Sequence, residues 1–157
     1  MTHQLAQLLI DKHWQLATAE SCTGGLVAKL LTDVAGSSEW FERGFVTYSN
    51  AAKTELLGVP AALIEQHGAV SEEVVRAMAE GALQHSHAQA SLAITGIAGP
   101  SGGSAEKPVG LVWFAFAAKD RATQSVSKVF TGDRAAIREQ AAEFALEQLI
   151  NFILEKH

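Results

Sequence analysis

The feature that most limits the fold of this chain is a strand-to-helix junction near its N-terminus. A short apolar run at residues 15–19 leads into the small polar segment 18–25, and residues 26–34 then carry leucine and valine at helical spacing. Such a junction leaves backbone N–H groups unpaired at the positive end of a helix dipole, where a phosphate, a carboxylate or a developing oxyanion can bind. Ser21 is the hydroxyl that this junction presents. The alternative is that Ser21 only caps the helix and that the glycines serve close packing.

Helical and extended patterns alternate along the rest of the chain. The helical segments are expected at residues 3–13, 51–57, 61–67 and 72–85, the last capped by Ser71, and after an N-cap at Asp133. Residues 26–34 are expected to continue a helix that opens at Ser21. The extended segments are expected at residues 15–19, 40–49, 90–95, 109–118 and 124–130. This order predicts an α/β fold, a three-layer α/β/α sandwich with a mixed, mainly parallel sheet. Ligands in such folds bind beyond the strand ends, so Ser21, Tyr48 and the loop after Thr95 are predicted to share one pocket.

Size and composition indicate a single domain over residues 1–157, with 48% hydrophobic and 18% charged residues. The longest apolar run, residues 109–118, is shorter than the ~18 residues of a membrane span, and the first residues lack the pattern of a secretory signal. Cys22 is the single cysteine, which excludes a disulfide scaffold and fits a reducing cytoplasm. A net charge of −5 without clustered Lys and Arg argues against a nucleic-acid partner.

Neither a metal nor an organic cofactor is expected from the motifs. His85 and His87 are two positions apart and would not share a helix face, and the other histidines show no ligand spacing. The glycine-rich segments match neither a phosphate-binding P-loop nor a dinucleotide fingerprint.

Lys53 breaks a local rule of helix composition. Asn50 is predicted to cap the helix at residues 51–57, which places Lys53 at the third helical position, where acidic residues are favoured. A positive helix end and partial burial both lower the pKa of a lysine, which suits a base acting near neutral pH. The alternative is an exposed lysine whose amine reaches water.

A glycine-rich segment at residues 96–108 separates two of the predicted strands. Its four glycines and two prolines exclude a regular element, so it is predicted to be a loop. A loop of this length is either a binding loop or lid, or a mobile surface excursion, and its composition is compatible with both.

Four segments together carry a family resemblance. They are Thr-Ala-Glu-Ser-Cys-Thr-Gly-Gly (18–25), Phe-Glu-Arg-Gly-Phe-Val-Thr-Tyr-Ser-Asn (41–50), His-Gly-Ala-Val-Ser (67–71) and Thr-Gly-Ile-Ala-Gly-Pro-Ser-Gly-Gly-Ser-Ala-Glu-Lys-Pro-Val-Gly (95–110). In this order they resemble the nicotinamide-nucleotide amidase family, which is also found as the C-terminal domain of the competence/damage-inducible protein CinA. The resemblance covers nearly the whole chain and implies a stand-alone amidase domain.

The resemblance implies hydrolysis of the carboxamide of nicotinamide mononucleotide to nicotinate mononucleotide and ammonia, a salvage step in NAD recycling. The family's catalytic serine, tyrosine and lysine fall on Ser21, Tyr48 and Lys53: the serine attacks the amide carbon, the neutral lysine accepts its proton, and the tyrosine relays or orients that proton. Backbone N–H groups around residues 22–25 are the expected oxyanion donors. The expected substrate-binding residues are Thr23, Gly24, Gly25, Thr95, Gly96 and Gly99.

The implied partner is therefore a small-molecule nucleotide, with no metal, cofactor or membrane, and base rates among soluble oligomers favour a homodimer. Ala51 stands where family members often carry an acidic residue, so Lys53 lacks one first-turn charge. The phosphate contact is left open between the loop at residues 99–104, Arg43 and Arg134.

Two other interpretations are retained. Cys22 could be the nucleophile, because a thiol at a helix N-terminus can have a lowered pKa, although no histidine or acidic partner is evident for it. Alternatively, the chain could be a non-catalytic nucleotide-binding module, in which the glycine-rich turns cradle a phosphate and Lys53 pairs with it.

Overall fold

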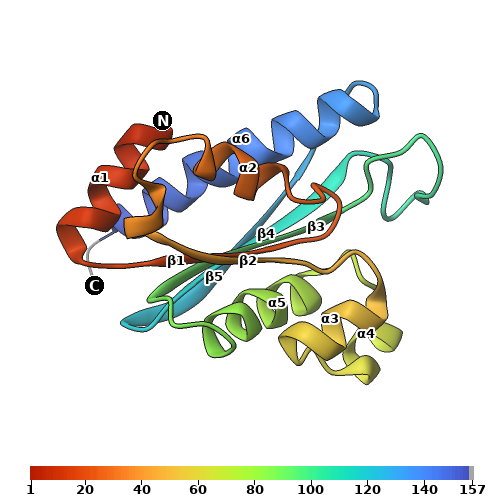
Figure 1. The fold of residues 1–157 in the computed structure, drawn as a ribbon. Helices are drawn as coiled ribbons and strands as arrows, with labels where there is room; N and C mark the ends of the chain where they lie inside the picture. The colour runs from red at the N-terminus through yellow and green to blue at the C-terminus, as the bar shows by residue number, and fades with distance from the viewer. Residues whose placement is uncertain (156–157) are drawn as a thin grey trace.

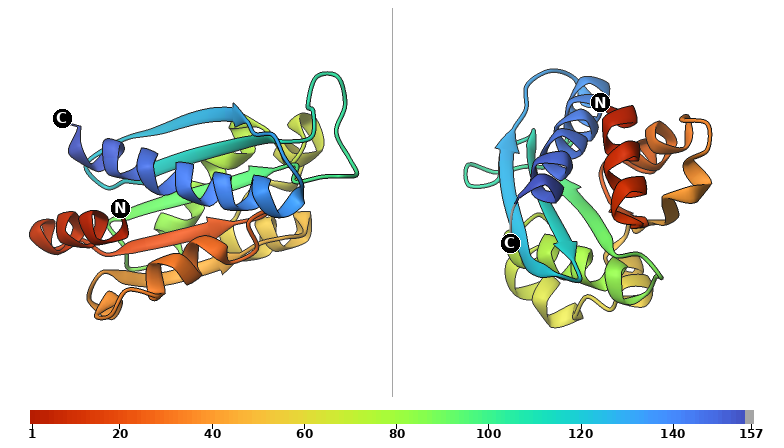
Figure 2. Two further views of the ribbon diagram at one scale, coloured as in Figure 1. Left: turned by 90° about the horizontal axis from the view of Figure 1, so that it is seen from above. Right: turned by 90° about the vertical axis from the view of Figure 1, so that its left-hand side faces the viewer.

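The computed structural model describes residues 1–155 and shows one sheet between two layers of helices (Figure 1). The elements are α1 (Thr2–Lys12), β1 (Leu16–Glu20), α2 (Leu26–Thr32), the 3-10 helix η1 (Ser37–Glu39), β2 (Phe41–Val46), α3 (Asn50–Leu57), α4 (Ala61–His67), α5 (Glu72–Gln84), β3 (Ala90–Gly96), β4 (Leu111–Ala118), β5 (Arg121–Val129) and α6 (Arg134–Leu154). Helices α1, α2 and α6 cover one face of the sheet, and α3, α4 and α5 cover the other (Figures 1 and 2). The predicted three-layer α/β/α sandwich is confirmed.

The five strands lie in the order β2-β1-β3-β4-β5. Strand β1 pairs in parallel with both β2 and β3, whereas β4 pairs antiparallel with both β3 and β5. Strand β5 therefore points the same way as β1, β2 and β3, and β4 alone runs against them. The expectation of a mixed, mainly parallel sheet is thus confirmed, and the carboxyl ends of β1, β2 and β3 meet at one edge.

Large and small side chains are sorted between the two faces of the central strands. Leu92, Ile94 and Phe114 are fully buried under α6 and its neighbours, where Phe114 packs against Phe144 with ring centroids 4.9 Å apart. The opposite face carries alanines, including Ala93, which leave room for α5 to lie close to the sheet. Helices cover both faces of these strands, and this is why their sequences are continuously apolar.

Two predicted helix starts are wrong, for local reasons. Helix α2 begins at Leu26 instead of Ser21, since Gly24 and Gly25 have left-handed φ values of 60° and 105° that no α-helix contains. The cap of α3 is Ser49, whose Oγ accepts the Ala52 N–H at 3.0 Å, so Asn50 is the first helical residue. Lys53 consequently occupies the fourth helical position.

The other two predicted N-caps are confirmed. The Ser71 hydroxyl accepts the backbone N–H of Val74 at the start of α5, and the Asp133 carboxylate accepts that of Ala136 at the start of α6. Both side chains sit where local composition predicted a helix to begin.

The glycine-rich segment is a loop, as predicted, and its two ends are held together. The Ile97 N–H donates to Leu111 O at 2.9 Å, and the Gly110 N–H donates to Ile97 O at 2.7 Å. The Lys107 amine donates to His67 O at 2.6 Å and so connects the loop to the end of α4. Within residues 1–155, every helix is too short or too polar to cross a membrane.

Candidate active site

A cavity of 240 Å³ lies where the carboxyl ends of β1, β2 and β3 meet. The Ser21 N–H donates to Ile94 O on β3 at 3.0 Å, and the Thr47 N–H donates to Glu20 O on β1 at 2.8 Å, so the three strand ends are directly linked. The lining residues are Ser21, Cys22, Tyr48, Asn50, Lys53, Ala69, Val70, Thr95, Gly96, Ala98 and Arg134. The structure thus brings together the three segments that strand order predicted to share a pocket.

Ser21 and Lys53 are in direct contact within this cavity. Lys53 Nζ lies 3.1 Å from Ser21 Oγ, although the two residues are 32 positions apart in sequence. The same amine lies 3.0 Å from Thr47 O and 3.1 Å from Tyr48 O. No ion pair within residues 1–155 includes Lys53, which is only 1% exposed. Burial therefore lowers the pKa of Lys53 below its ordinary value.

The local chain path explains why the lysine amine meets backbone carbonyls. Side chains on an α-helix lean toward its N-terminus, so Lys53 in the first turns of α3 reaches back over residues 47–49, which lead into that helix. Gly81 of α5 lets the end of α3 lie close to α5, because a Cβ at Gly81 would collide with Leu57 O. The close approach of α5 thus helps to fix α3, the helix that carries Lys53.

Glu20, which the sequence analysis did not single out, organises the turn that carries Ser21. Its buried carboxylate accepts the Thr23 hydroxyl at 2.6 Å and the backbone N–H groups of Val27 and Ala28 at 2.9 and 3.1 Å. The N-terminus of α2 is therefore occupied by the protein's own carboxylate, and the expectation that it is free for a ligand is wrong. The available signal was an acidic residue at the end of an apolar strand with a threonine three positions later.

Three backbone N–H groups of this turn, those of Cys22, Thr23 and Gly25, have no acceptor within residues 1–155, and of these three residues Cys22 alone lines the cavity. Within the turn, the Gly24 N–H donates to Ser21 O and the Leu26 N–H donates to Thr23 O, both at 3.1 Å. In nucleophile turns of this general kind, the N–H that follows the nucleophile is a common oxyanion donor.

The Tyr48 side chain lies at the mouth of the cavity. Its hydroxyl accepts from Arg134 Nη2 at 3.2 Å, and the residue is 62% exposed. Arg134 also donates through Nη1 to Gly99 O at 2.8 Å. Tyr48 meets Lys53 through its backbone carbonyl, and its hydroxyl contacts neither Lys53 nor Ser21.

The predicted substrate-binding residues divide into two groups. Thr95 and Gly96 line the cavity, and the Thr95 hydroxyl donates to Ala69 O at 2.9 Å. Thr23, Gly24 and Gly25 lie in the turn between β1 and α2, and Gly99 accepts from Arg134 through its carbonyl; none of these four lines the cavity.

Of the cations considered for a phosphate, only Arg134 lines the cavity. Arg43 instead donates to Glu42 and to His85 O, away from the cavity. Asn50, Ala69 and Val70 are wall residues that sequence reasoning did not select, although each falls within one of the segments that resemble the family.

The thiol of Cys22 is poorly suited to nucleophilic attack. Burial raises the pKa of Cys22 to about 11, so the thiol is protonated at neutral pH. The thiolate, which is the reactive form, is therefore scarce, whereas the neighbouring Ser21 hydroxyl has a lysine amine beside it.

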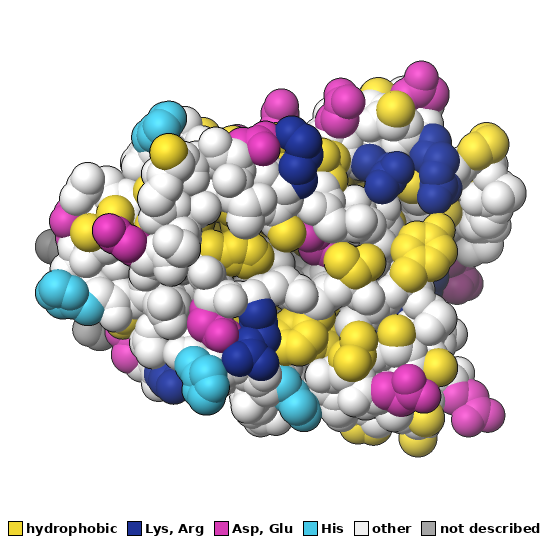
Figure 3. All heavy atoms as spheres, in the orientation of Figure 1, with side chains coloured by type: hydrophobic (Ala, Val, Ile, Leu, Met, Phe, Trp, Pro, Cys, Tyr) yellow, Lys and Arg dark blue, Asp and Glu magenta, His cyan; other side chains and the backbone are white. Residues whose placement is uncertain are grey.

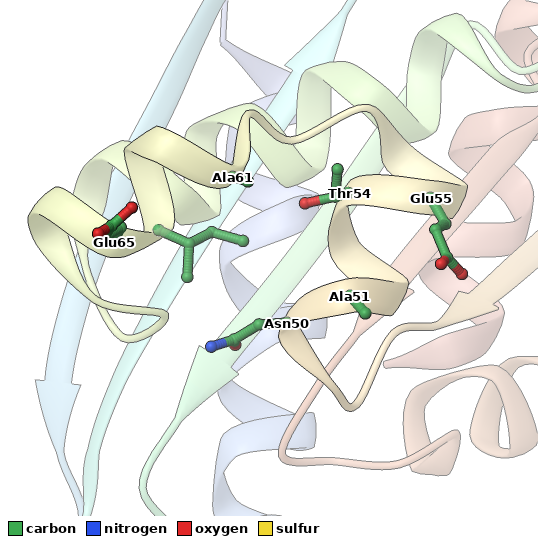
Figure 4. A pocket seen from close by; sticks show the side chains of 7 residues that line it. Asn50, Ala51, Thr54, Glu55, Ala61 and Glu65 are labelled. Carbon is green, nitrogen blue, oxygen red and sulfur yellow. The ribbon is translucent and has the colours of Figure 1, made fainter.

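The larger groove beside the cavity has fewer reactive side chains in its walls. A larger groove of 510 Å³ lies between α3 and α4 and shares Asn50 with the cavity, but its walls contain no lysine, histidine, serine or cysteine (Figure 4). Residues 1–155 contain no group of three or more His, Cys, Asp or Glu placed to hold a metal ion. On the face shown in Figure 3, Lys and Arg side chains occur singly or in pairs among acidic and uncharged ones.

Comparison with known proteins is consistent across sequence and structure. The family model described as the CinA C-terminal domain matches residues 1–153. Nicotinamide-nucleotide amidohydrolase PncC of Enterobacter agglomerans is 58% identical over 92% of this chain and 88% of that protein. PncC of Escherichia coli strain K12 is 54% identical over 95% of this chain and 90% of that protein. The crystal structure of the competence/damage inducible protein CihA from Agrobacterium tumefaciens superposes with a TM-score of 0.90 at 44% identity, covering 96% of this chain and 93% of that one.

Proposed function

The chain belongs to the CinA C-terminal domain family, and from that membership we propose that it is a nicotinamide-nucleotide amidohydrolase that uses Ser21 as its nucleophile. The reaction is hydrolysis of the carboxamide of nicotinamide mononucleotide to nicotinate mononucleotide and ammonia. The observation that carries the mechanism is the 3.1 Å contact between Ser21 Oγ and the buried Lys53 amine. A hydroxyl beside an uncharged base is the arrangement that covalent catalysis at an amide requires.

The contacts of Lys53 suit a neutral amine acting as the base. Backbone carbonyls surround the amine at 3.0 Å (Thr47 O), 3.1 Å (Tyr48 O) and 3.5 Å (Ser49 O). In the neutral form its two N–H groups donate to the two nearer carbonyls, which leaves the nitrogen lone pair for the Ser21 hydroxyl proton. Ser21 Oγ attacks the carboxamide carbon while its proton moves to Lys53, and Lys53 then protonates the departing ammonia. Water attacks the resulting ester with Lys53 again as the base, which releases the carboxylate and returns the proton to Ser21.

The oxyanion formed in both steps needs a fixed donor. The Cys22 N–H is the donor we assign, because it adjoins Ser21 and has no acceptor within residues 1–155. One such donor contributes about 3 kcal/mol to transition-state stabilisation.

Arg134 and Tyr48 are proposed to hold the nucleotide end of the substrate. The Arg134 guanidinium lines the cavity and can bind a phosphate through two parallel N–H groups, one of which now contacts the Tyr48 hydroxyl. Tyr48 also holds Lys53 through its backbone carbonyl, which is how it assists proton transfer in this scheme. We further propose that the protein acts as a cytoplasmic homodimer in the salvage of pyridine nucleotides.

Ammonia release from nicotinamide mononucleotide, measured with a chelator present, tests the proposal. The parent protein is expected to turn over, and Ser21→Ala is expected to lose roughly 10⁴-fold or more in kcat while staying folded. Ser38→Ala, at an exposed serine of η1, is the matched control and should keep full activity. An inactive parent that binds the nucleotide tightly would favour a non-catalytic binding module, and full activity in Ser21→Ala would remove the serine from the reaction.

A further inference from the structure

Arg138 of α6 contacts the nucleophile turn from the side away from Lys53. Its Nε donates to Cys22 O at 3.1 Å and its Nη2 donates to Thr23 O at 3.2 Å. These contacts join residues 116 and 115 positions apart in sequence. A Cβ at Gly24 would lie 3.0 Å from the same Nη2, so the guanidinium packs directly on this turn. Arg138 does not line the cavity, so its contacts act on the backbone that carries the nucleophile.

The two carbonyls that Arg138 holds are linked to the proposed oxyanion donor through rigid peptide planes. In a trans peptide the C=O and the following N–H point in opposite directions, so fixing Thr23 O also fixes the Gly24 N–H. The Gly24 N–H donates to Ser21 O at 3.1 Å, and Ser21 O belongs to the peptide that carries the Cys22 N–H. The direction of the Cys22 N–H is therefore set by two peptide planes, one of which Arg138 holds directly.

The hydrogen bond from Arg138 to Cys22 O is not duplicated by another donor within residues 1–155. Within residues 1–155, Cys22 O accepts a hydrogen bond from Arg138 alone, whereas Ser21 O and Thr23 O each accept one from the turn itself. The charge of the guanidinium also polarises the peptides that it holds, which strengthens the hydrogen bonds that follow along the chain.

We infer that Arg138 is a positioning residue for the reaction: by holding the carbonyls of Cys22 and Thr23 it keeps the Cys22 N–H aimed at the oxyanion that forms beside Ser21. This inference rests on the proposed function. A donor that acts only on the developing charge stabilises the transition state and not the bound substrate. Loss of Arg138 should therefore lower kcat and leave substrate affinity unchanged.

The test compares Arg138→Ala with Arg76→Ala. Arg76 of α5 is a matched control, since it is also half-buried and donates to a hydroxyl and a backbone carbonyl, Ser125 Oγ at 2.9 Å and Thr123 O at 3.2 Å, away from the cavity. Arg138→Ala is expected to lower kcat about 10- to 100-fold with KM within about threefold of the parent, while Arg76→Ala keeps its kcat. Arg138→Lys keeps a charged donor for a carbonyl but lacks the planar guanidinium, so it should recover part of the lost kcat. It replaces the alanine variant in the test if that variant does not fold.

Two binding measurements separate positioning from a structural role. In a Ser21→Ala background, nicotinamide mononucleotide should bind equally well with Arg138 or alanine at that position. The aldehyde analogue of the substrate, which forms a tetrahedral adduct with Ser21, should bind more weakly to Arg138→Ala by the same factor as the loss in kcat. A change in KM alone, or a kcat equal to that of Arg76→Ala, would overturn the inference while the proposed function stands. A parent that releases no ammonia would overturn both.

Discussion

Glu20 and Lys53 are both ionisable, both 1% exposed and both at the same edge of the sheet, yet their surroundings differ in kind. The Glu20 carboxylate is met by a hydroxyl and two backbone N–H groups, so every close partner is a donor. The Lys53 amine is met by backbone carbonyls and the Ser21 hydroxyl, and no carboxylate of residues 1–155 balances an ammonium charge there. A buried acid with three donors builds the turn, whereas a buried amine without a counter-charge is available for chemistry.

The two groups are mechanically connected through Thr47. Its N–H donates to Glu20 O at 2.8 Å, and its carbonyl oxygen lies 3.0 Å from the Lys53 amine. One peptide segment after β2 therefore joins the backbone of Glu20 to the Lys53 amine. The comparison predicts that changes at Lys53 affect turnover and that changes at Glu20 affect folding.

The largest expected effect is on the turnover of Lys53→Met. Methionine has a similar length and fills the buried space, so the fold should be retained, but it cannot accept a proton. We expect kcat for ammonia release to fall roughly 10⁴-fold, in line with the loss of a base that acts together with its nucleophile. Activity within tenfold of the parent, in a variant with the parent's far-UV circular dichroism, would contradict the role of Lys53.

The second-largest effect is expected in the pH dependence of kcat/KM. Burial lowers the pKa of Lys53, so the neutral amine exists at pH values where an ordinary lysine, with a pKa near 10.5, is charged. Activity should therefore reach its plateau below pH 10.5 and fall about tenfold per pH unit on the acid side of the lowered pKa, because protonation removes the base. A rate that rises only around pH 10.5 would show that Lys53 titrates like a free lysine.

A smaller effect is expected for Glu20→Gln, and it should appear as a lower free energy of unfolding. The glutamine oxygen can replace one carboxylate oxygen, but its NH₂ group would face the Ala28 N–H, which leaves a buried donor unpaired. We expect a loss of about 1–3 kcal/mol in the free energy of unfolding, measured by urea titration, with kcat of the folded protein within tenfold of the parent. Glu143→Gln on the exposed side of α6 is the control and should change neither quantity. A large loss of kcat at unchanged stability would reverse the comparison.

The smallest effect is expected for Cys22→Ala. With its pKa raised to about 11 by burial, the Cys22 thiol is protonated at neutral pH and poorly suited to attack, and alanine keeps the backbone N–H that we assign to the oxyanion. Ammonia release should stay within about threefold of the parent. A loss comparable to that of Ser21→Ala would make the thiol the nucleophile.

The order of helices and strands, the caps at Ser71 and Asp133 and the loop after β3 could all be predicted from the sequence. These features depend on side-chain periodicity and on bonds between residues three or four positions apart, which the linear sequence displays directly. The same reasoning placed Ser21, Tyr48 and the loop after Thr95 near one another, because parallel strands end at one edge of a sheet.

The contacts that define the site belong to the tertiary structure alone. Three features each depend on where separate elements pack: the exposed position of the Tyr48 side chain, the Glu20 carboxylate at the N-terminus of α2, and the hydrogen bonds from Arg138 to the turn that carries Ser21. The Ser21 and Lys53 atoms likewise meet at 3.1 Å only through the register of β1 with β2 and the placement of α3. By itself the sequence determined which reactive residues lie at the strand ends. Packing between elements distant in the chain decided which of their atoms face each other, because no local pattern encodes those distances.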